Sequence, residues 1–211
     1  MNMERRKELP YFEIGGEPGG NQEWFSDPWM YLGGCGATTA CDFCIQQAVH
    51  AGRENLVPFP SVKAAEGGLS RREYVRFGMA MKQFLRPRWM GINSTKLFMD
   101  GFQEYLRSVG ETGYVMQPLE GDQPVEAARE AVRSRIDAGI PVPFLTLHHK
   151  DPEYKDLVWH WYPVIGYREE AEDFVLKTAT YGDVLWLSLR RLWDTGYDEK
   201  GGIVLIQRIG E

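Results

Sequence analysis

The spacing of apolar residues divides the chain into two parts that meet near Ile140. In the first part, apolar residues recur every three or four positions, which is typical of helices that bury one face. One of these helices begins at Ser70-Arg71-Arg72-Glu73, a capping box in which the Ser and Glu side chains bind the first free backbone amides. Helices are predicted over about 35–50, 70–85, 93–110 and 125–138, and a short extended segment over 114–116.

In the second part, short apolar segments alternate with polar turns, as in antiparallel strands. The first segment contains Pro141 and Pro143, which predict an edge strand or a strand start, because proline has no N–H to donate. Strands are predicted over about 140–147, 157–167, 173–180, 184–189 and 203–209. Helices followed by strands predict an α+β fold, with one domain over 1–211 in which a helical part (about 20–139) packs on a β-rich part (about 140–211).

Composition excludes several classes of protein. The 211 residues are 43% hydrophobic and 13% aromatic, which is enough for a substantial core and opposes global disorder. The net charge is −6 and both signs are mixed along the chain, whereas a nucleic-acid groove needs a concentrated basic face. The charged start, residues 1–8, precedes no apolar signal core, and no apolar segment is long enough to span a bilayer. We therefore expect no nucleic-acid or membrane partner and a cytoplasmic location.

The segment Tyr31-Leu32-Gly33-Gly34-Cys35-Gly36 predicts a tight loop that leads directly into a helix. Cys35 then lies in the first turn, where free N–H groups and the helix dipole stabilise negative charge. Such a position lowers the pKa of a thiol and favours the reactive thiolate. Cys35 is therefore a candidate nucleophile, and the alternative is an inert cysteine buried at a helix start.

The three cysteines lie within ten residues, which opposes a disulfide framework. Cys35, Cys41, Cys44 and His50 offer four metal ligands, but they lie along one helix, whereas a structural zinc site joins two separated segments. Cys41 and Cys44 are better explained as core residues. We expect neither a metal nor a cofactor.

His160 is the candidate base, because it lies near the start of an aromatic strand and a neutral imidazole can take a proton at neutral pH. The alternative for His160 is a packed, hydrogen-bonded core residue. The pair His148-His149 is the competing candidate, although the following Lys150-Asp151-Pro152 favours a solvated loop. Sequence spacing alone does not choose between them, because nucleophile and base meet only in the fold.

Four segments resemble one known family. Gly34-Cys35-Gly36-Ala37-Thr38-Thr39-Ala40 resembles the nucleophile motif of the C39-like branch of the papain-like cysteine peptidases, in which a Gly-Cys-Gly loop begins the central helix. His160-Trp161-Tyr162-Pro163-Val164-Ile165-Gly166-Tyr167 resembles its histidine strand, and Asp137-Ala138-Gly139-Ile140-Pro141-Val142 is similar to the step that precedes that strand. Asn21-Gln22-Glu23-Trp24 resembles the upstream segment whose Gln donates to the oxyanion. The likeness spans about residues 20–195, and the middle helices are specific to this chain.

The resemblance implies a papain-like fold in which the nucleophile helix packs on an antiparallel sheet. It also implies that Cys35 attacks a carbonyl carbon and that His160 acts as base and then as acid. The Gln22 side chain and the Cys35 backbone N–H would stabilise the oxyanion. The alternative for Gln22 is a surface loop residue. The implied substrate is a peptide or small amide.

One position departs from the family pattern. Papain-like enzymes orient the histidine with Asn or Asp on the following strand, and the segment Lys177–Gly182 resembles that strand but has Ala179 there. Thr178, Thr180, Asp183 or a backbone carbonyl are the possible substitutes. Without one of them the site is weakened or inactive, and Ala179→Asn is predicted to raise the rate.

Three hypotheses for the function follow. The first is a cysteine hydrolase that cleaves a peptide or other amide bond through a Cys35–His160 diad. The second is a non-catalytic module that keeps the fold and binds peptides in an aromatic-lined cleft. The third is an amidase or another acyl-transfer activity, such as a transglutaminase-like reaction, on the same fold.

Overall fold

Seven strands of the described residues form one sheet in which all neighbours are antiparallel. The structure is a computed structural model that describes residues 5–89 and 91–209. Six strands follow the order β4-β9-β5-β6-β7-β8, and β1 pairs with β6 beyond the end of β5. The strands are β1 (Arg6–Glu8), β4 (Tyr114–Glu120), β5 (Val142–Thr146), β6 (His160–Glu169), β7 (Phe174–Thr180), β8 (Asp183–Ser188) and β9 (Gly201–Arg208). A separate hairpin joins β2 (Glu13–Ile14) to β3 (Glu17–Pro18).

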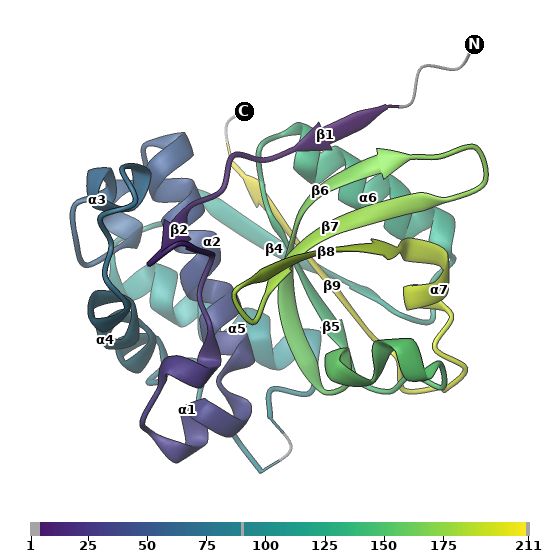
Figure 1. Cartoon of the computed structure of the whole chain (residues 1–211), viewed down its shortest axis with the longest axis horizontal. Coiled ribbons are helices and arrows are strands. Elements are labelled where there is room, and N and C mark those ends of the chain that lie inside the picture. Colours follow the sequence, from purple (N-terminus) through teal and green to yellow (C-terminus); the bar gives the residue numbers. More distant parts are fainter. Residues whose placement is uncertain (1–4, 90, 210–211) are drawn as a thin grey trace.

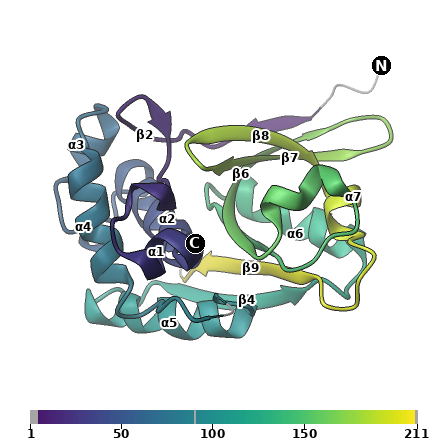
Figure 2. The same cartoon turned by 60° about the horizontal axis from the view of Figure 1, so that its bottom comes forward.

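The helices lie in two groups, and the fold is of the α+β class. The α-helices are α1 (Pro28–Gly33), α2 (Cys35–Ala51), α3 (Ser61–Ala65), α4 (Arg71–Met81), α5 (Thr95–Ser108), α6 (Val125–Asp137) and α7 (Leu189–Trp193). The short 3₁₀ helices are η1 (Gln22–Trp24), η2 (Glu54–Leu56) and η3 (Pro152–Leu157). Figure 1 shows α1–α5 on one side of the molecule and the large sheet on the other. Figure 2 shows the sheet bending around α6.

The sheet separates two buried apolar clusters. The first joins the N-terminal helices to one face of the sheet, where Trp161 of β6 stacks on Phe98 of α5 with ring centroids 4.5 Å apart. The second packs Val132 and Ile136 of α6 against the other face, which carries Tyr162. Most of α2 is buried inside the first cluster, so this helix occupies the centre of the helical layer. Because residues alternate along a strand, neighbouring residues of β6 face different clusters.

Of the two positions predicted for the prolines, the edge strand is wrong, because β5 lies between β9 and β6, whereas the strand start is confirmed, because β5 begins at Val142 between Pro141 and Pro143. Two features allow Pro143 in this inner strand. It lies opposite Pro163 in the register of β5 with β6, and the pairing of β5 with β9 extends only over Phe144–Thr146. Pro143 thus lies outside the ladder with β9, where its missing N–H leaves no paired acceptor unsatisfied.

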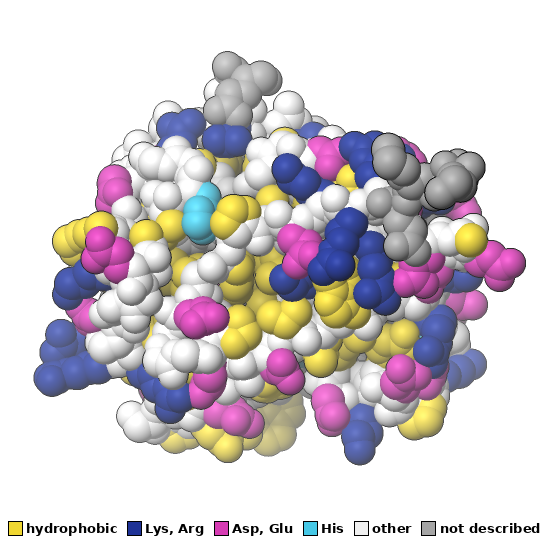
Figure 3. Space-filling view, turned by 45° about the horizontal axis from the view of Figure 1, so that its top comes forward, with side chains coloured by type: hydrophobic (Ala, Val, Ile, Leu, Met, Phe, Trp, Pro, Cys, Tyr) yellow, Lys and Arg dark blue, Asp and Glu magenta, His cyan; other side chains and the backbone are white. Residues whose placement is uncertain are grey.

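The surface mixes charges of both signs. On the face shown in Figure 3, Lys and Arg side chains lie among Asp and Glu, and hydrophobic side chains line a hollow between them. Within 5–89 and 91–209, no helix combines the length and the apolar character that crossing a membrane requires.

Candidate functional site

Cys35 begins α2, as the sequence predicts, and the backbone before it is tightly folded. The Gly34 N–H donates to the Met30 carbonyl over 2.9 Å, and a Cβ atom on Gly34 would overlap that oxygen. Only glycine therefore fits between α1 and α2. The Cys35 side chain is 6% exposed and lies at the helix end with the free N–H groups.

His160 is the first residue of β6, and a threonine holds its ring. The Thr180 hydroxyl lies 2.7 Å from His160 Nε2. The sequence offered three side chains that could replace the missing Asn, namely Thr178, Thr180 and Asp183. The hydroxyl that contacts the imidazole is that of Thr180. Because side chains alternate along β7, Ala179 lies on the opposite face from Thr180. An asparagine at position 179 would therefore not point at Nε2.

Tyr181 covers the other side of the imidazole. Its ring stacks on His160 with centroids 4.6 Å apart and an 8° angle between the planes, and its hydroxyl lies 3.3 Å from Nδ1. Burial, and next the Cys35 charge, raise the pKa of Tyr181 to about 12, so its hydroxyl keeps its proton at neutral pH. The hydroxyl is thus placed to donate to Nδ1.

Backbone strain is concentrated at this point of the fold. Trp159 and Tyr181 are the non-glycine residues with positive φ in the described part of the chain, at 57° and 52°. Trp159 directly precedes His160, and Tyr181 directly follows Thr180. Side chains rarely adopt this conformation, and it is enriched at functional sites because it aims a neighbouring group at a cost of about 1–3 kcal/mol. The two residues frame the imidazole.

Cys35 and His160 line the same small cavity, with Gln22 and Tyr181 also on its wall. Its volume is about 10 Å³, which is room for roughly one water molecule. The Cys35 Sγ atom lies 4.0 Å from the Trp159 carbonyl oxygen, and among the described residues no hydrogen bond joins Sγ to the imidazole. Gln22 in η1 is half-buried, and its Oε1 has no hydrogen-bond partner among these residues. The three predicted site residues thus border one cavity, but the His160 ring packs beside Tyr162, on the face of the sheet opposite to Trp161 and α2.

The predicted lowering of the Cys35 pKa is wrong. Burial raises the pKa of this thiol, and the backbone N–H groups of Trp161, Gly36 and Cys35 oppose the rise only in part. Desolvation also lowers the pKa of His160 to about 3. Both effects disfavour charge, so the resting pair is a neutral thiol and a neutral imidazole at pH 7. The packing of α2 against β6 removes water from this helix terminus, and the loss of solvation outweighs the helix dipole.

The other candidate residues lie elsewhere. His149 Nδ1 accepts from the Asp151 N–H at 3.0 Å, and its Nε2 lies 2.9 Å from the Arg191 carbonyl. His148 packs against Trp159 and Tyr197 rather than on the small cavity. Cys41 and Cys44 are fully buried, and burial raises the pKa of both well above that of a free thiol. In 5–89 and 91–209, no group of three or more His, Cys, Asp or Glu residues is arranged to hold a metal ion.

The sequence interpretation missed one functional candidate, Asp42. Its carboxylate is 2% exposed and accepts from the Tyr11 hydroxyl at 2.8 Å, the Tyr74 hydroxyl at 2.7 Å and the Gly20 N–H at 3.1 Å. Burial raises the pKa of Asp42 to about 6, although all three donors favour the ionised form. Since Gly20 leads into η1, Asp42 ties the segment that carries Gln22 to α2. Its place seven residues after Cys35, among small helical residues, was the available signal.

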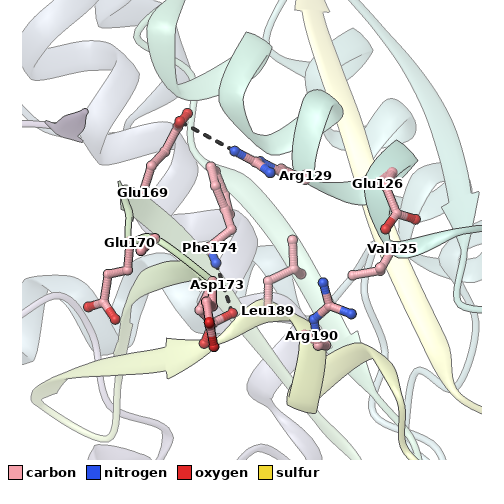
Figure 4. A pocket seen from close by; sticks show the side chains of 11 residues that line it. Val125, Glu126, Arg129, Glu169, Glu170, Asp173, Phe174, Leu189 and Arg190 are labelled. Atoms are coloured by element: carbon pink, nitrogen blue, oxygen red, sulfur yellow. Dashed lines mark hydrogen bonds and ion pairs between the residues drawn. The ribbon is translucent and has the colours of Figure 1, made fainter. Parts of the chain in front are cut away.

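A second cavity lies on the opposite side of the sheet, between α6 and the turn from β6 to β7 (Figure 4). It has a volume of about 610 Å³ and is lined by charges of both signs. Glu169 on its wall accepts from Arg129 and Arg133, and both guanidinium groups also lie over the Phe174 ring. Among the described residues, further charges of the wall, those of Glu126, Glu172, Asp173 and Arg190, form no ion pair, and no cysteine or histidine lines this cavity.

Comparison of the chain with family models, curated proteins and solved structures found no match. The likeness of the Cys35 and His160 segments to C39-like peptidases thus remains a resemblance in sequence.

Proposed function

We propose that the protein is a cysteine hydrolase that cleaves a peptide or other amide bond, with Cys35 as nucleophile and His160 as base. The observation that carries the proposal is the small cavity that both Cys35, at a helix N-terminus, and His160 border, with the His160 ring fixed by Thr180. A nucleophile, a base and a third group that orients the base are the parts that covalent amide cleavage requires. The two strained residues beside the imidazole support the same location.

The neutral resting pair determines how the reaction begins. With Nε2 held by Thr180, the thiol proton passes to Nδ1 as sulfur attacks the carbonyl carbon. The Tyr181 hydroxyl lies 3.3 Å from Nδ1, so it must move aside or relay the proton, and the imidazole must turn toward Sγ. The imidazolium then protonates the leaving amine. Water hydrolyses the thioester with His160 again acting as base.

The tetrahedral oxyanion needs preorganised donors. The Cys35 backbone N–H and the Gln22 amide, on the same cavity, are the candidates. Losing one donor of this type costs about 2.7–4 kcal/mol of transition-state stabilisation. Gln22→Ala is accordingly expected to lower kcat by about 100- to 1000-fold.

The raised Cys35 pKa favours a second function, a peptide-binding module without turnover. In such a module the neutral thiol is only part of the wall. The two functions differ in the effect of removing the Cys35 sulfur. A hydrolase loses turnover, whereas a binding module keeps its affinity for peptides.

Turnover of internally quenched peptides by wild type, Cys35→Ala, His160→Gln and the control His148→Gln tests the proposal. A peptidyl acyloxymethyl ketone, which alkylates active-site thiols, provides a second readout by mass mapping. We expect turnover and labelling to be lost in Cys35→Ala and strongly reduced in His160→Gln, with His148→Gln like wild type. Turnover that is retained in Cys35→Ala, or labelling of His160→Gln that equals that of wild type, would overturn the mechanism.

A further inference from the structure

Cys35 borders two cavities of opposite character. On one side is the small polar cavity with His160, and on the other is an apolar groove of about 670 Å³. The groove is lined by α1, by Arg88, Trp89 and Gly91, and by the strained Trp159. The small cavity has no room for a substrate chain, so a reacting carbonyl group reaches Sγ from the groove.

The groove carries an unusual concentration of exposed apolar side chains. Trp89 is 90% exposed, Leu32 is 78% exposed and Trp29 is 51% exposed, and all three line it. Large exposed apolar side chains that gather around one hollow mark an interaction site, whereas isolated ones do not. Their burial by a ligand would remove this apolar surface from water.

The far end of the groove is basic. It continues into a second hollow of about 370 Å³ that shares Trp29, Arg88 and Trp89 and is also lined by Lys82 and Arg86. Lys82 is neutralised by Asp27 at 2.6 Å, whereas Arg86 and Arg88 form no ion pair among the described residues. In a chain of net charge −6, two unpaired arginines at the end of an apolar groove favour an acidic group on the ligand.

We infer that this groove selects peptides with a bulky apolar side chain next to the reacting carbonyl and an acidic side chain a few residues away. Trp29, Leu32 and Trp89 would cover the apolar side chain, and Arg86 and Arg88 would pair with the carboxylate. The choice of reacting carbonyl rests on the proposed function. The binding preference does not, because it needs only the groove.

Binding and turnover are therefore measured separately. Binding to Cys35→Ala is measured by calorimetric titration with capped heptapeptides that contain one Phe and one Glu. The position of Glu is varied on both sides of Phe. In the matched control peptides, Phe is replaced by Ala or Glu by Lys. We expect Phe→Ala in the peptide to weaken binding by about tenfold or more. Glu→Lys is expected to weaken it by about two- to fivefold, and added salt to reduce that difference.

Substitutions in the protein test the two parts of the groove. Arg88→Glu is expected to abolish or reverse the preference for Glu, and Trp29→Ala to reduce the preference for Phe. Arg190→Glu, which lines the distant cavity of Figure 4, is the matched charge control and should match the parent. Trp29 and Arg88 are exposed, so neither substitution is expected to change folding. Thermal melting of each variant checks this.

Each outcome is decisive. Absence of binding up to about 1 mM, or affinities indifferent to Phe and to charge, overturns the inference. Binding to anionic lipid vesicles in place of peptides also overturns it and assigns the groove to a membrane surface. Selective binding by Cys35→Ala without turnover by wild type keeps the inference and rejects the hydrolase. Turnover by wild type without a preference for Phe and Glu keeps the hydrolase and overturns the inference.

Discussion

The hydroxyl of Thr180 lies 2.7 Å from Nε2 of His160, on the strand where the resembled enzymes place Asn or Asp. His160 is 4% exposed, so this hydroxyl is a fixed partner of a buried ring. The relationship identifies which group orients the candidate base, and it can be tested by substitution.

Thr180→Val removes the hydroxyl and keeps the shape of the side chain. We expect kcat to fall by about 10- to 100-fold, because the imidazole loses the group that fixes its rotamer and tautomer. Leaving Nε2 buried without a partner should also lower the free energy of unfolding by about 1–3 kcal/mol. Thr178→Val, on the same face of β7 two residues earlier, is the matched control and should retain activity. Equal effects of the two substitutions would show that Thr180 has no specific role.

From the structure we expect Ala179→Asn to give the opposite result to that expected from the resemblance. Ala179 is 2% exposed and lines the small cavity with Cys35, on the face of β7 opposite to Thr180, so a carboxamide there would fill the cavity without reaching Nε2. We expect no gain in kcat/KM and a destabilisation of about 1–3 kcal/mol from overpacking. Thr180→Asn is the informative comparison, because it places a carboxamide on the correct face. Faster turnover by Ala179→Asn than by wild type would contradict this orientation.

Much of the fold was predictable, because periodicity and capping act locally. The cap at Ser70 and the polar turns between apolar segments are read from adjacent residues, and the corresponding helix and strands are present. The short elements α1, α3, α7 and the hairpin β2–β3 were missed, because each contains few residues and depends on tertiary contacts. The inner position of β5 was also hidden, since a strand's neighbours are chosen by the rest of the sheet.

The candidate site also contains residues that a local pattern predicts and residues that only the fold brings into place. Cys35 carries its own local signal, two glycines before a helix, whereas its burial depends on β6 packing above it. Thr180 was one of several equivalent candidates until its contact with His160 was known. For Asp42 the local signal was weak, because its three donors come from separate parts of the chain. Contacts of this kind are properties of the fold and are absent from any short segment.

Cys35 is expected to react with iodoacetamide before Cys41 and Cys44. Burial raises the pKa of all three thiols, but least for Cys35, which also borders the apolar groove. Because the thiolate is the reactive form, the rate should be low at pH 7 and rise steadily as pH increases above 8. Peptide mapping of the alkylated protein over time measures the order. The unfolded protein in urea is the control, in which the three cysteines should react at similar rates. Earlier labelling of Cys41 or Cys44 in the folded protein would contradict the assignment.

Asp42 is expected to make stability depend on pH. Its pKa is about 6 in the folded protein, chiefly because of burial, and about 3.9 in an unfolded chain. The folded state therefore binds more protons between these values, and the stability due to protonated Asp42 is fully present below pH 4 and is lost as pH rises through about 6. Relative to Asp42→Asn, which cannot titrate, wild type should lose up to about 1.4 kcal/mol of unfolding free energy per pH unit in this window.

Urea unfolding of wild type and Asp42→Asn at several pH values from 4 to 7.5 measures this difference. The groups that face Asp42 are the Tyr11 and Tyr74 hydroxyls, the Gly20 N–H and the neighbouring Cys41 thiol, and burial raises the pKa of all three side chains. None of them therefore titrates in the window, and the slope belongs to Asp42. Asp100→Asn, which changes an exposed carboxylate on α5, is the control and should track wild type. A constant difference between wild type and Asp42→Asn across the window would show that Asp42 keeps one protonation state, and its link to Gly20 would then be independent of pH.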